Sequence, residues 1–403
     1  MIIKKIFTGL AGITIMVAAL TAAFIFQDIW ASFDNRKTEG TQRRLNARLL
    51  DLAPNKWVKI RSDERLGWHR QAHSGIAFDS KRGTLLIFGS DTHGMNWDNS
   101  VHEFDPAAEK WTTHYPEAPM ETYRSDEEGR AICGDAMVLP WAMHTYDNIT
   151  YDPHLDAIVV TALPAHNPVK KKVPSANAAT VHPTWIYDLT SHSWRIFKNK
   201  SGEKSPTFFA AGSAYDETRN VVMAYKNGGV WELGPDRAQW QRATKESHHE
   251  IHFNMVYNSI YRICAVFGNH KNTNEVWVYA PGQTAGEKGI WQKKIPGGDP
   301  CPRDQHFPVA VDESTGLILL LPDNNIFLEE NGSSKPVMAE SASTFIYDYK
   351  NNVYKKIPGG DFPSQKMNYM MVYDSFHKVF LLVTEDVKKP LTVWALKLDS
   401  SIL

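Results

Sequence analysis

Short apolar runs separated by polar turns extend over most of this chain, and one arrangement of them recurs six times. Each copy has an apolar residue, an aromatic residue or Val, and Asp or Asn, followed by a short polar turn and a second apolar run. The Asp or Asn residues of the copies are Asp79, Asp152, Asp216, Asn258, Asp312 and Asp374. The apolar runs after them are residues 85–88, 158–160, 221–223, 263–267, 317–321 and 379–383. Repeated strand–turn–strand units are typical of a β-propeller, because one small sheet cannot bury both of its faces and copies must stack around an axis.

A second repeat follows the first within the same units. An aromatic residue, or Leu in one copy, precedes a Trp or Tyr by seven positions, and one further copy has a longer turn. The pairs are Phe104 and Trp111, Tyr187 and Trp194, Leu233 and Trp240, Tyr279 and Trp291, and Tyr347 and Tyr354. Residues such as Asp105 and Pro106 between the partners favour reversal of the chain. Each unit is therefore predicted to have four strands.

The sixth unit lacks one strand, because the chain ends soon after the apolar run at residues 391–396. Residues 56–60 form a strand-like segment ahead of the first unit, where no partner strand is predicted. Pairing this segment into the last unit would leave no open edge between the termini. We therefore predict an all-β fold, a six-bladed β-propeller with four-stranded blades, closed by an N-terminal strand in the last blade.

A four-stranded unit with a paired aromatic residue and Trp resembles the kelch family of propellers, over residues 55–399. The Gly-Gly pair of that family is reduced here to single glycines, Gly89 and Gly268, with Gly228-Gly229 as a displaced copy. The resemblance implies the propeller fold and says little about activity, because propellers serve unrelated functions.

The N-terminus differs from the rest of the chain. Residues 6–26 carry no charge, follow the basic start Lys4-Lys5, and are long enough to cross a bilayer as a helix. We expect an uncleaved signal anchor or, as the alternative, a cleaved signal peptide. Residues 1–27 would be this segment, residues 28–54 a linker with some helix at 45–52, and residues 55–403 the propeller. The propeller would then face an extracytoplasmic space, the periplasm or the cell surface, attached to the membrane through residues 6–26.

Composition and cysteine content limit the partners. The net charge is −1 with 22% charged residues, so nothing indicates a nucleic acid partner. Cys264 lies in an apolar run and is expected to be a buried thiol. Cys133 and Cys301 lie in loops between units, and in an exported protein they could pair.

The long connections are expected on one face of the propeller. In a four-stranded blade the second-to-third turns and the crossings to the next blade share a face. Nearly all long connections fall in these two classes: residues 117–143, 163–183, 296–305 and 322–341. Because binding residues concentrate on long loops, we expect ligands on this face. Neutral insertion is the competing interpretation.

The same face carries unusual polar residues where the first strand of each unit begins. Six positions before each repeat Asp or Asn stand His73, Tyr146, Ala210, His252, His306 and Asn368. Three positions further back stand Arg70, Met143, Thr207, His249, Arg303 and Gln365. Because the first strand is innermost, these side chains are predicted to surround one channel mouth, together with His144. Histidines that only cap or pack strand ends are the alternative.

Arginine and histidine converging on one opening favour an anionic ligand, because guanidinium pairs with carboxylate or sulfate through two hydrogen bonds. We expect Arg70, His73, His249, His252, His306 and Asn368 to bind the ligand. Aromatic residues nearby, Trp68, Tyr123 and Trp141, could stack on sugar rings, and residues 170–172 add lysines. An acidic polysaccharide or oligosaccharide fits these groups.

Residues 143–148 resemble a His-Thr-Tyr-Asp stretch of propeller-type bacterial polysaccharide lyases. The resemblance implies β-elimination at a uronate, which needs a cation for the carboxylate, a base for the C5 proton and an acid for the leaving oxygen. His144, Tyr146 and Arg303 are the catalytic candidates.

Two further alternatives stay open. We predict no cofactor, although His73, His252 and His306 could ligate a divalent metal if their side chains point inward. The long-loop face could instead bind another protein, which would make the chain an interaction scaffold.

Overall fold

The computed structural model describes residues 45–63, 73–94, 96–164, 167–268, 275–302, 307–323, 326–330, 333–337, 341–365, 367–384, 391–399 and 401. The chain divides into two units, Met1–Leu45 and Asn46–Leu403, and the second holds the sheets. Residues 6–26, Trp68, Arg70, Arg303 and His306 lie outside the described residues. Among the residues that are described, no helix has the length and apolar character needed to span a bilayer.

Antiparallel sheets, most of them four-stranded, make up the second unit. The sheet β2-β3-β4-β5 is formed by Gly75–Asp79, Thr84–Phe88, His102–Asp105 and Lys110–Thr113. The sheet β9-β10-β11-β12 is formed by Ile149–Asp152, Ala157–Val160, Trp185–Asp188 and Ser193–Ile196. The sheet β13-β14-β15-β16 is formed by Gly212–Asp216, Val221–Lys226, Gly229–Leu233 and Trp240–Thr244. The sheet β17-β18-β19-β20 is formed by Asn254–Asn258, Ile263–Phe267, Val276–Ala280 and Ile290–Lys294.

The remaining two large sheets complete the set. One has the order β22-β23-β26-β27, from Val309–Val311, Ile318–Leu320, Ser341–Asp348 and Val353–Pro363, with β21 (Gly297–Gly298) added in parallel to β27. The other has the order β28-β29-β30-β1, from Met371–Asp374, Val379–Thr384, Leu391–Leu396 and Val58–Asp63.

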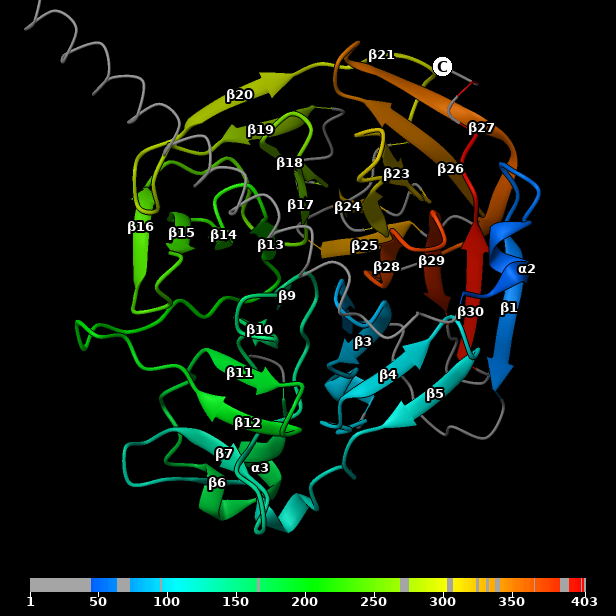
Figure 1. The fold of residues 1–403 in the computed structure, drawn as a ribbon. Coiled ribbons are helices and arrows are strands. Elements are labelled where there is room, and N and C mark those ends of the chain that lie inside the picture. The colour runs from blue at the N-terminus through cyan, green and yellow to red at the C-terminus, as the bar shows by residue number, and fades with distance from the viewer. Residues whose placement is uncertain are drawn as a thin grey trace, which may run out of the picture. The chain divides into compact units, whose positions relative to one another are not determined.

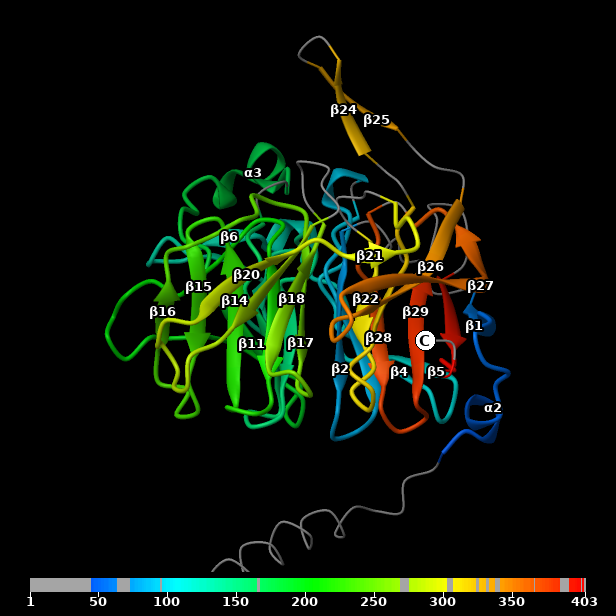
Figure 2. The same cartoon turned by 90° about the horizontal axis from the view of Figure 1, so that it is seen from above.

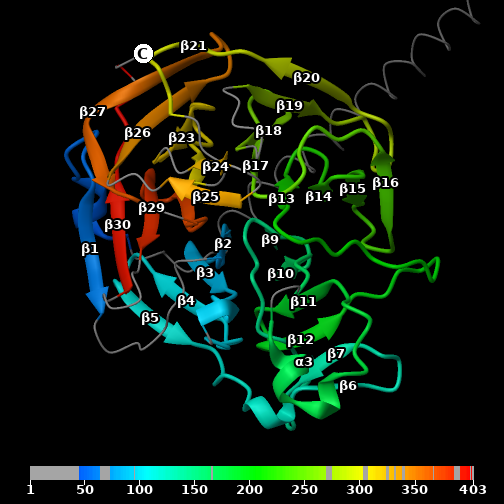
Figure 3. The same ribbon diagram turned by 180° about the vertical axis from the view of Figure 1, so that it is seen from behind.

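The sheets lie around a common centre (Figures 1 and 3). Their innermost strands are β2, β9, β13, β17, β22 and β28, and each contacts the next, with β28 contacting β2. Neighbouring sheets are thereby packed against one another around the centre, as the repeat predicted. This all-β arrangement is consistent with a β-propeller.

The repeat Asp residues build the turn after each innermost strand. In Asp79, Oδ1 accepts hydrogen bonds from the backbone N–H groups of Lys81 and Arg82. Asp152, Asp216 and Asp374 bond the second and third residues after them in the same way. An Asp side chain that bonds its own following backbone stabilises a tight turn, which explains why Asp recurs here.

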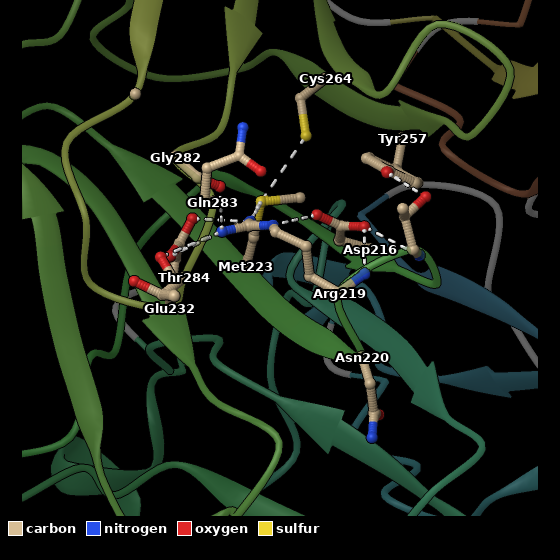
Figure 4. Close-up of polar contacts among 12 residues, drawn as sticks. Asp216, Arg219, Asn220, Met223, Glu232, Tyr257, Cys264, Gly282, Gln283 and Thr284 are labelled. Carbon is tan, nitrogen blue, oxygen red and sulfur yellow. Dashed lines mark hydrogen bonds and ion pairs between the residues drawn. The ribbon is translucent and has the colours of Figure 1, made fainter. Parts of the chain in front are cut away.

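The second oxygen of several repeat Asp residues pairs with an Arg or His side chain. Asp216, which is 1% exposed, binds the Nε of Arg219 at 2.5 Å. Arg219 also reaches the fully buried Glu232 at 2.9 Å (Figure 4). Asp152 is paired with Arg237, and Asp374 with His377. These pairs satisfy carboxylates that the sheets enclose.

The paired aromatic residues face one another across neighbouring strands. Phe104 is the register partner of Trp111, Tyr187 of Trp194, Leu233 of Trp240, Tyr279 of Trp291 and Tyr347 of Tyr354. The ring centroids of Phe104 and Trp111 are 5.0 Å apart, within the range in which aromatic pairs stabilise a sheet.

The strand ahead of the first unit pairs with the end of the chain, as predicted. In the register of β1 and β30, Val58 lies opposite Ala395 and Asp63 opposite Leu391. The helical turn α2 (Ala47–Leu50) buries Leu49 in the hydrophobic cluster that also contains side chains of β1 and β30. Residues 46–54, expected as part of the linker, therefore belong to the unit of sheets.

Two of the long connections form a small substructure. Residues 117–143 contain η2 (Met120–Thr122) and the sheet β6-β7-β8, from Arg124–Ser125, Ala131–Cys133 and Leu139–Pro140. Residues 163–183 contain α3 (Val169–Lys172) and η3 (Pro174–Ala176). The two connections are joined where Arg130 bridges Val181. The connection predicted at residues 322–341 contains the hairpin β24 (Ile326–Glu330) and β25 (Ser333–Val337). Figure 2 shows α3 and this hairpin at the same end of the unit, opposite the short turns.

The cysteines are thiols. Cys133 is buried in the core cluster under the insertions, whereas Cys301 packs against a different cluster, and the two are not joined by a disulfide. Cys264 is fully buried in β18, as expected from its apolar run.

Candidate functional site

An axial cavity of about 350 Å³ lies between the innermost strands. Its lining comes from β2, β9, β13, β17, β22 and β28 together with the turns that follow five of them. The charged residues among the described lining are Asp147, Glu217 and Glu313. The described lining has carboxyl groups and no Lys, Arg or His, so it offers an anion no cationic partner. We therefore expect an anion site outside the cavity, at the end where the innermost strands begin.

Backbone hydrogen bonds bring the residues at the starts of the innermost strands together. The N–H of Tyr146 donates to the carbonyl of His73 at 2.9 Å, and the N–H of His252 donates to that of Ala210 at 2.8 Å. The N–H of His73 donates to the carbonyl of Met367 at 3.3 Å. Two pairs of positions six residues before a repeat Asp or Asn, His73 with Tyr146 and Ala210 with His252, are thus neighbours in space.

The same positions share an unusual backbone conformation. The φ angles of His73, Tyr146, Ala210 and His252 are 70°, 49°, 47° and 58°. A left-handed conformation costs a residue with a side chain ~1–2 kcal/mol. This conformation recurs at equivalent positions, so we attribute it to the hydrogen bonds that join the starts of the innermost strands. It sets the direction of these side chains at the end of the cavity.

Thr145 fixes the segment that carries His144 and Tyr146. Its Oγ1 accepts a hydrogen bond from the N–H of Gly75 at 2.6 Å and donates one to the carbonyl of Phe88. A Cβ on Gly75 would lie 2.3 Å from the carbonyl oxygen of Tyr146, so only glycine allows this approach. The segment is held on the ends of β2 and β3, and the side chains on either side of Thr145 are held with it.

A hydrogen bond of 3.0 Å joins Nδ1 of His144 to the hydroxyl of Tyr146. The Nε2 of His144 lies 3.2 Å from the backbone N of Thr92, which can only donate. Nε2 is therefore the acceptor nitrogen, and Nδ1 carries the proton that it donates to Tyr146. The Tyr146 hydroxyl oxygen thus accepts a hydrogen bond from His144, and its own proton can be donated to another acceptor. Burial, and to a lesser degree the charge of Asp91, raise the pKa of this hydroxyl above its usual value.

Other rings surround Tyr146. His73 stacks on His144 with centroids 4.1 Å apart, and both rings meet the edge or face of Tyr146 within 5.5 Å. His252 lies 5.6 Å from Tyr146 on another side. Phe209 and Tyr369 complete the contacts at 5.3 and 5.5 Å. We call His73, His144, Tyr146 and His252 the mouth cluster.

The carboxylate of Asp91 lies beside two histidines of the mouth cluster. Asp91 follows β3 and lies 3.4 Å from Nδ1 of His73 and 3.7 Å from Nε2 of His144, in each case measured from Oδ1. Within the described ranges, His73, Asp91 and His144 are the residues whose ligand atoms are grouped closely enough to hold a metal ion. The metal ligands expected from sequence were His73, His252 and His306; of these, the structure puts only His73 in this group, and His306 is not described.

Two expected ligand-binding residues are placed elsewhere. His249 is 3% exposed, bonds the hydroxyl of Tyr225 at 3.1 Å and packs on Phe253. Burial, with His248 nearby, lowers the pKa of His249 to about 3. Asn368 is fully buried, and its amide bonds Gln365 and Val383 within its own sheet. The structure thus gives both side chains packing contacts and does not bring them to Tyr146.

The aromatic residues expected to stack on sugars are also internal. Tyr123 is fully buried, Trp141 is 2% exposed, and both belong to the core of the insertions. Asp91, His93, Phe209 and Tyr369 were missed in the sequence. Phe209 precedes the ring position Ala210, and Tyr369 follows Asn368, so the repeat register could have found these two. Asp91 and His93 lie outside the repeat.

Neither a scan against protein-family models nor a search of the curated proteins gives a match to this chain.

Proposed function

We propose that the unit of sheets is a six-bladed β-propeller of the kelch type, closed by β1, and that it binds an anionic ligand beside the mouth cluster. The ligand class is acidic carbohydrate. The observation that carries the proposal is the gathering of the rings of His73, His144 and His252 around the ring of Tyr146. Imidazole and phenol groups donate hydrogen bonds to carboxylate and hydroxyl oxygens, and their ring faces suit sugar rings.

The position of the mouth cluster supports the same proposal. It lies at the starts of β2, β9 and β17, the end of the unit from which the insertions emerge (Figure 2). Arg70 and Arg303, three residues before His73 and His306, are the cations proposed to pair with ligand carboxylates.

Titration calorimetry with uronic-acid oligosaccharides and with neutral oligosaccharides of equal length tests this function. We expect binding of the acidic set only, and loss of it in Arg70→Ala plus Arg303→Ala and in His252→Ala. His154→Ala is the matched control, because His154 is exposed and lies at the other end of β9 from Tyr146. Equal binding of both oligosaccharide sets, or binding unchanged in the arginine variant, contradicts the proposal.

A second candidate function, β-elimination by a polysaccharide lyase, is favoured by the hydrogen bond between His144 and Tyr146. In this proposal His144 orients the Tyr146 hydroxyl, which gives its proton to the leaving oxygen. The partly buried His252 takes the C5 proton, the C4–O bond breaks as the double bond forms, and Arg303 pairs with the uronate carboxylate.

The ultraviolet absorbance of unsaturated uronates separates the two candidates. A lyase produces this absorbance from at least one acidic polymer, and Tyr146→Phe abolishes it while leaving oligosaccharide binding within about twofold. Binding without product from any polymer tested leaves the first candidate alone.

We also propose that residues 6–26 attach the protein to a membrane, with the sheets on the extracytoplasmic side. Fractionation of cells and protease treatment of spheroplasts test this proposal. Recovery of the intact chain in the cytosol contradicts it.

A further inference from the structure

We infer that His73, Asp91 and His144 form a binding site for one divalent transition-metal ion, with Nδ1 of His73, Oδ1 of Asp91 and Nε2 of His144 as ligands. The inference goes beyond the proposed function, and its test needs no carbohydrate.

The first support is the orientation of His73. Its Nε2 lies 2.8 Å from the thioether sulfur of Met367, which can only accept a hydrogen bond. Nε2 therefore carries a proton, and in the neutral ring Nδ1 presents a lone pair. This Nδ1 is buried, has no hydrogen-bond partner and faces Asp91. His73 as a whole is only 9% exposed. A buried lone pair directed at a carboxylate oxygen is unfavourable unless a proton or a metal cation lies between them, and a metal cation is inferred here.

The second support is that three acceptor atoms converge. Nε2 of His144 lies 3.7 Å from the same Oδ1 of Asp91, and Nδ1 of His73 lies 3.4 Å from that oxygen. The lone pair of this Nε2 is used at present by Thr92, whose backbone N and Oγ1 lie 3.2 and 3.0 Å away. Two ligands of a tetrahedral zinc ion, each bound at ~2.1 Å, lie ~3.4 Å apart. All three ligand atoms lie within 4.8 Å of one another, so small side-chain rotations would complete the geometry.

The third support lies in the groups behind the ligands. A metal-bound histidine usually donates its other ring N–H to an oxygen, which fixes its tautomer. His144 donates Nδ1–H to Tyr146, and His73 donates Nε2–H to Met367. Both rings thus have the tautomer that metal binding requires. On metal binding, the Nε2 of His144 would exchange its long hydrogen bond from Thr92 for the ion.

The ligand set indicates the class of metal. Two imidazoles and one carboxylate suit Zn²⁺ and also Co²⁺, Ni²⁺ or Mn²⁺, and three protein ligands leave a position open. The exposed His93, whose ring centroid is 4.7 Å from that of His144, is the nearest further imidazole among the described residues.

The test is titration of the full-length, chelator-treated protein with ZnCl₂ by calorimetry and with CoCl₂ by visible absorbance. We expect one ion per chain, with a cobalt spectrum of a four- or five-coordinate site. Each of His73→Ala and His144→Ala should weaken binding by more than ~100-fold, and Asp91→Asn by at least ~10-fold. His154→Ala should bind within about twofold of the unchanged protein.

A second readout keeps the test decisive if an alanine variant folds poorly. Bound Zn²⁺ stabilises the folded state and raises its melting temperature, and Asp91→Asn, which keeps the side-chain shape, should lose most of this rise. Absence of binding to the folded protein, or binding unchanged in Asp91→Asn and the alanine variants, overturns the inference. In that case a proton shared between His73 and Asp91 accounts for their approach.

Discussion

The carboxylate of Asp147 accepts a hydrogen bond of 2.6 Å from the backbone N–H of Met255, a residue 108 positions further along the chain. The backbone of Asp147 is bonded at the same time to Ser213. Asp147 thus links the starts of β9, β13 and β17 directly beside Tyr146. Part of its surface faces the axial cavity, but the protein around it raises the pKa of the carboxyl well above its usual value.

Two replacements of Asp147 should distinguish how much its hydrogen bond and how much its charge contribute to the free energy of unfolding. Asp147→Asn keeps an acceptor for Met255, whereas Asp147→Ala leaves that N–H unpaired and should cost ~1–3 kcal/mol. The raised pKa means that the folded state binds the proton more tightly than the unfolded state, so this group's contribution falls as pH rises above ~3.9. Chemical denaturation should therefore show Asp147→Asn at least as stable as the unchanged protein at pH 7. A loss as large as that of Asp147→Ala would show that the negative charge itself is required.

The buried ion pairs of Arg219 should be costly to break. Arg219→Met leaves Asp216 and Glu232, which are 1% and 0% exposed, without their cation (Figure 4). We expect the free energy of unfolding to fall by ~3–5 kcal/mol, because an uncompensated charge then remains buried. Lys356→Met is the matched control. Its pair with Asp361 is exposed, so urea denaturation should show a change below ~1 kcal/mol. Similar losses for both variants would mean that Arg219 contributes no more than a surface pair.

Glu313 should make the fold less stable as the solution becomes alkaline. Partial desolvation of the Glu313 carboxyl by the protein at the cavity entrance, with Glu217, Asp312 and Asp374 nearby, raises its pKa to about 7. The folded state therefore holds this proton between pH ~4.3 and about 7, and the favourable contribution is lost as pH rises through that range. Glu313→Gln should melt at a higher temperature than the unchanged protein at pH 8 and at the same temperature at pH 4. Because Glu313 is exposed to water, the gain should stay below ~1 kcal/mol. A difference of equal size at both pH values would exclude titration of Glu313 as its cause.

Closure by β1 can be tested by truncation. Removal of residues 1–45 leaves α2 and β1 in place, and this variant should melt as the full chain does. Removal of residues 1–63 exposes the edge of β30 and the core around Leu49 and Ile60. An unpaired edge strand promotes association between chains, so this variant should melt earlier and aggregate. Light scattering during a thermal ramp measures both effects. If both truncations behave alike, β1 contributes little to the closed arrangement.

The local pattern of the chain was enough to predict the sheets. Alternation of apolar and polar residues sets which face of a strand is buried, and Asp at the turn bonds its own backbone, so both signals act within a few residues. This is why the turns at Asp79 and Asp216, the register pair of Phe104 and Trp111, and the pairing of β1 with β30 follow from sequence. The repeat also predicted that His73, Tyr146 and His252 would be neighbours, because equivalent positions meet when units stack around an axis.

Only the tertiary structure decided which polar side chains face a ligand and which are used in packing. Asn368 has the same repeat position as His73 and His252, yet it bonds Gln365 inside the core. His249 has the repeat position of Arg70, yet it bonds Tyr225 inside the core. Asp91 has no repeat signal, and it reaches His73 and His144 because the connection after β3 folds back over the start of β2. Side-chain direction depends on contacts between residues far apart in the chain. The periodicity of a sequence determines which residues become neighbours around the axis, but it carries no information about which of them turn inward.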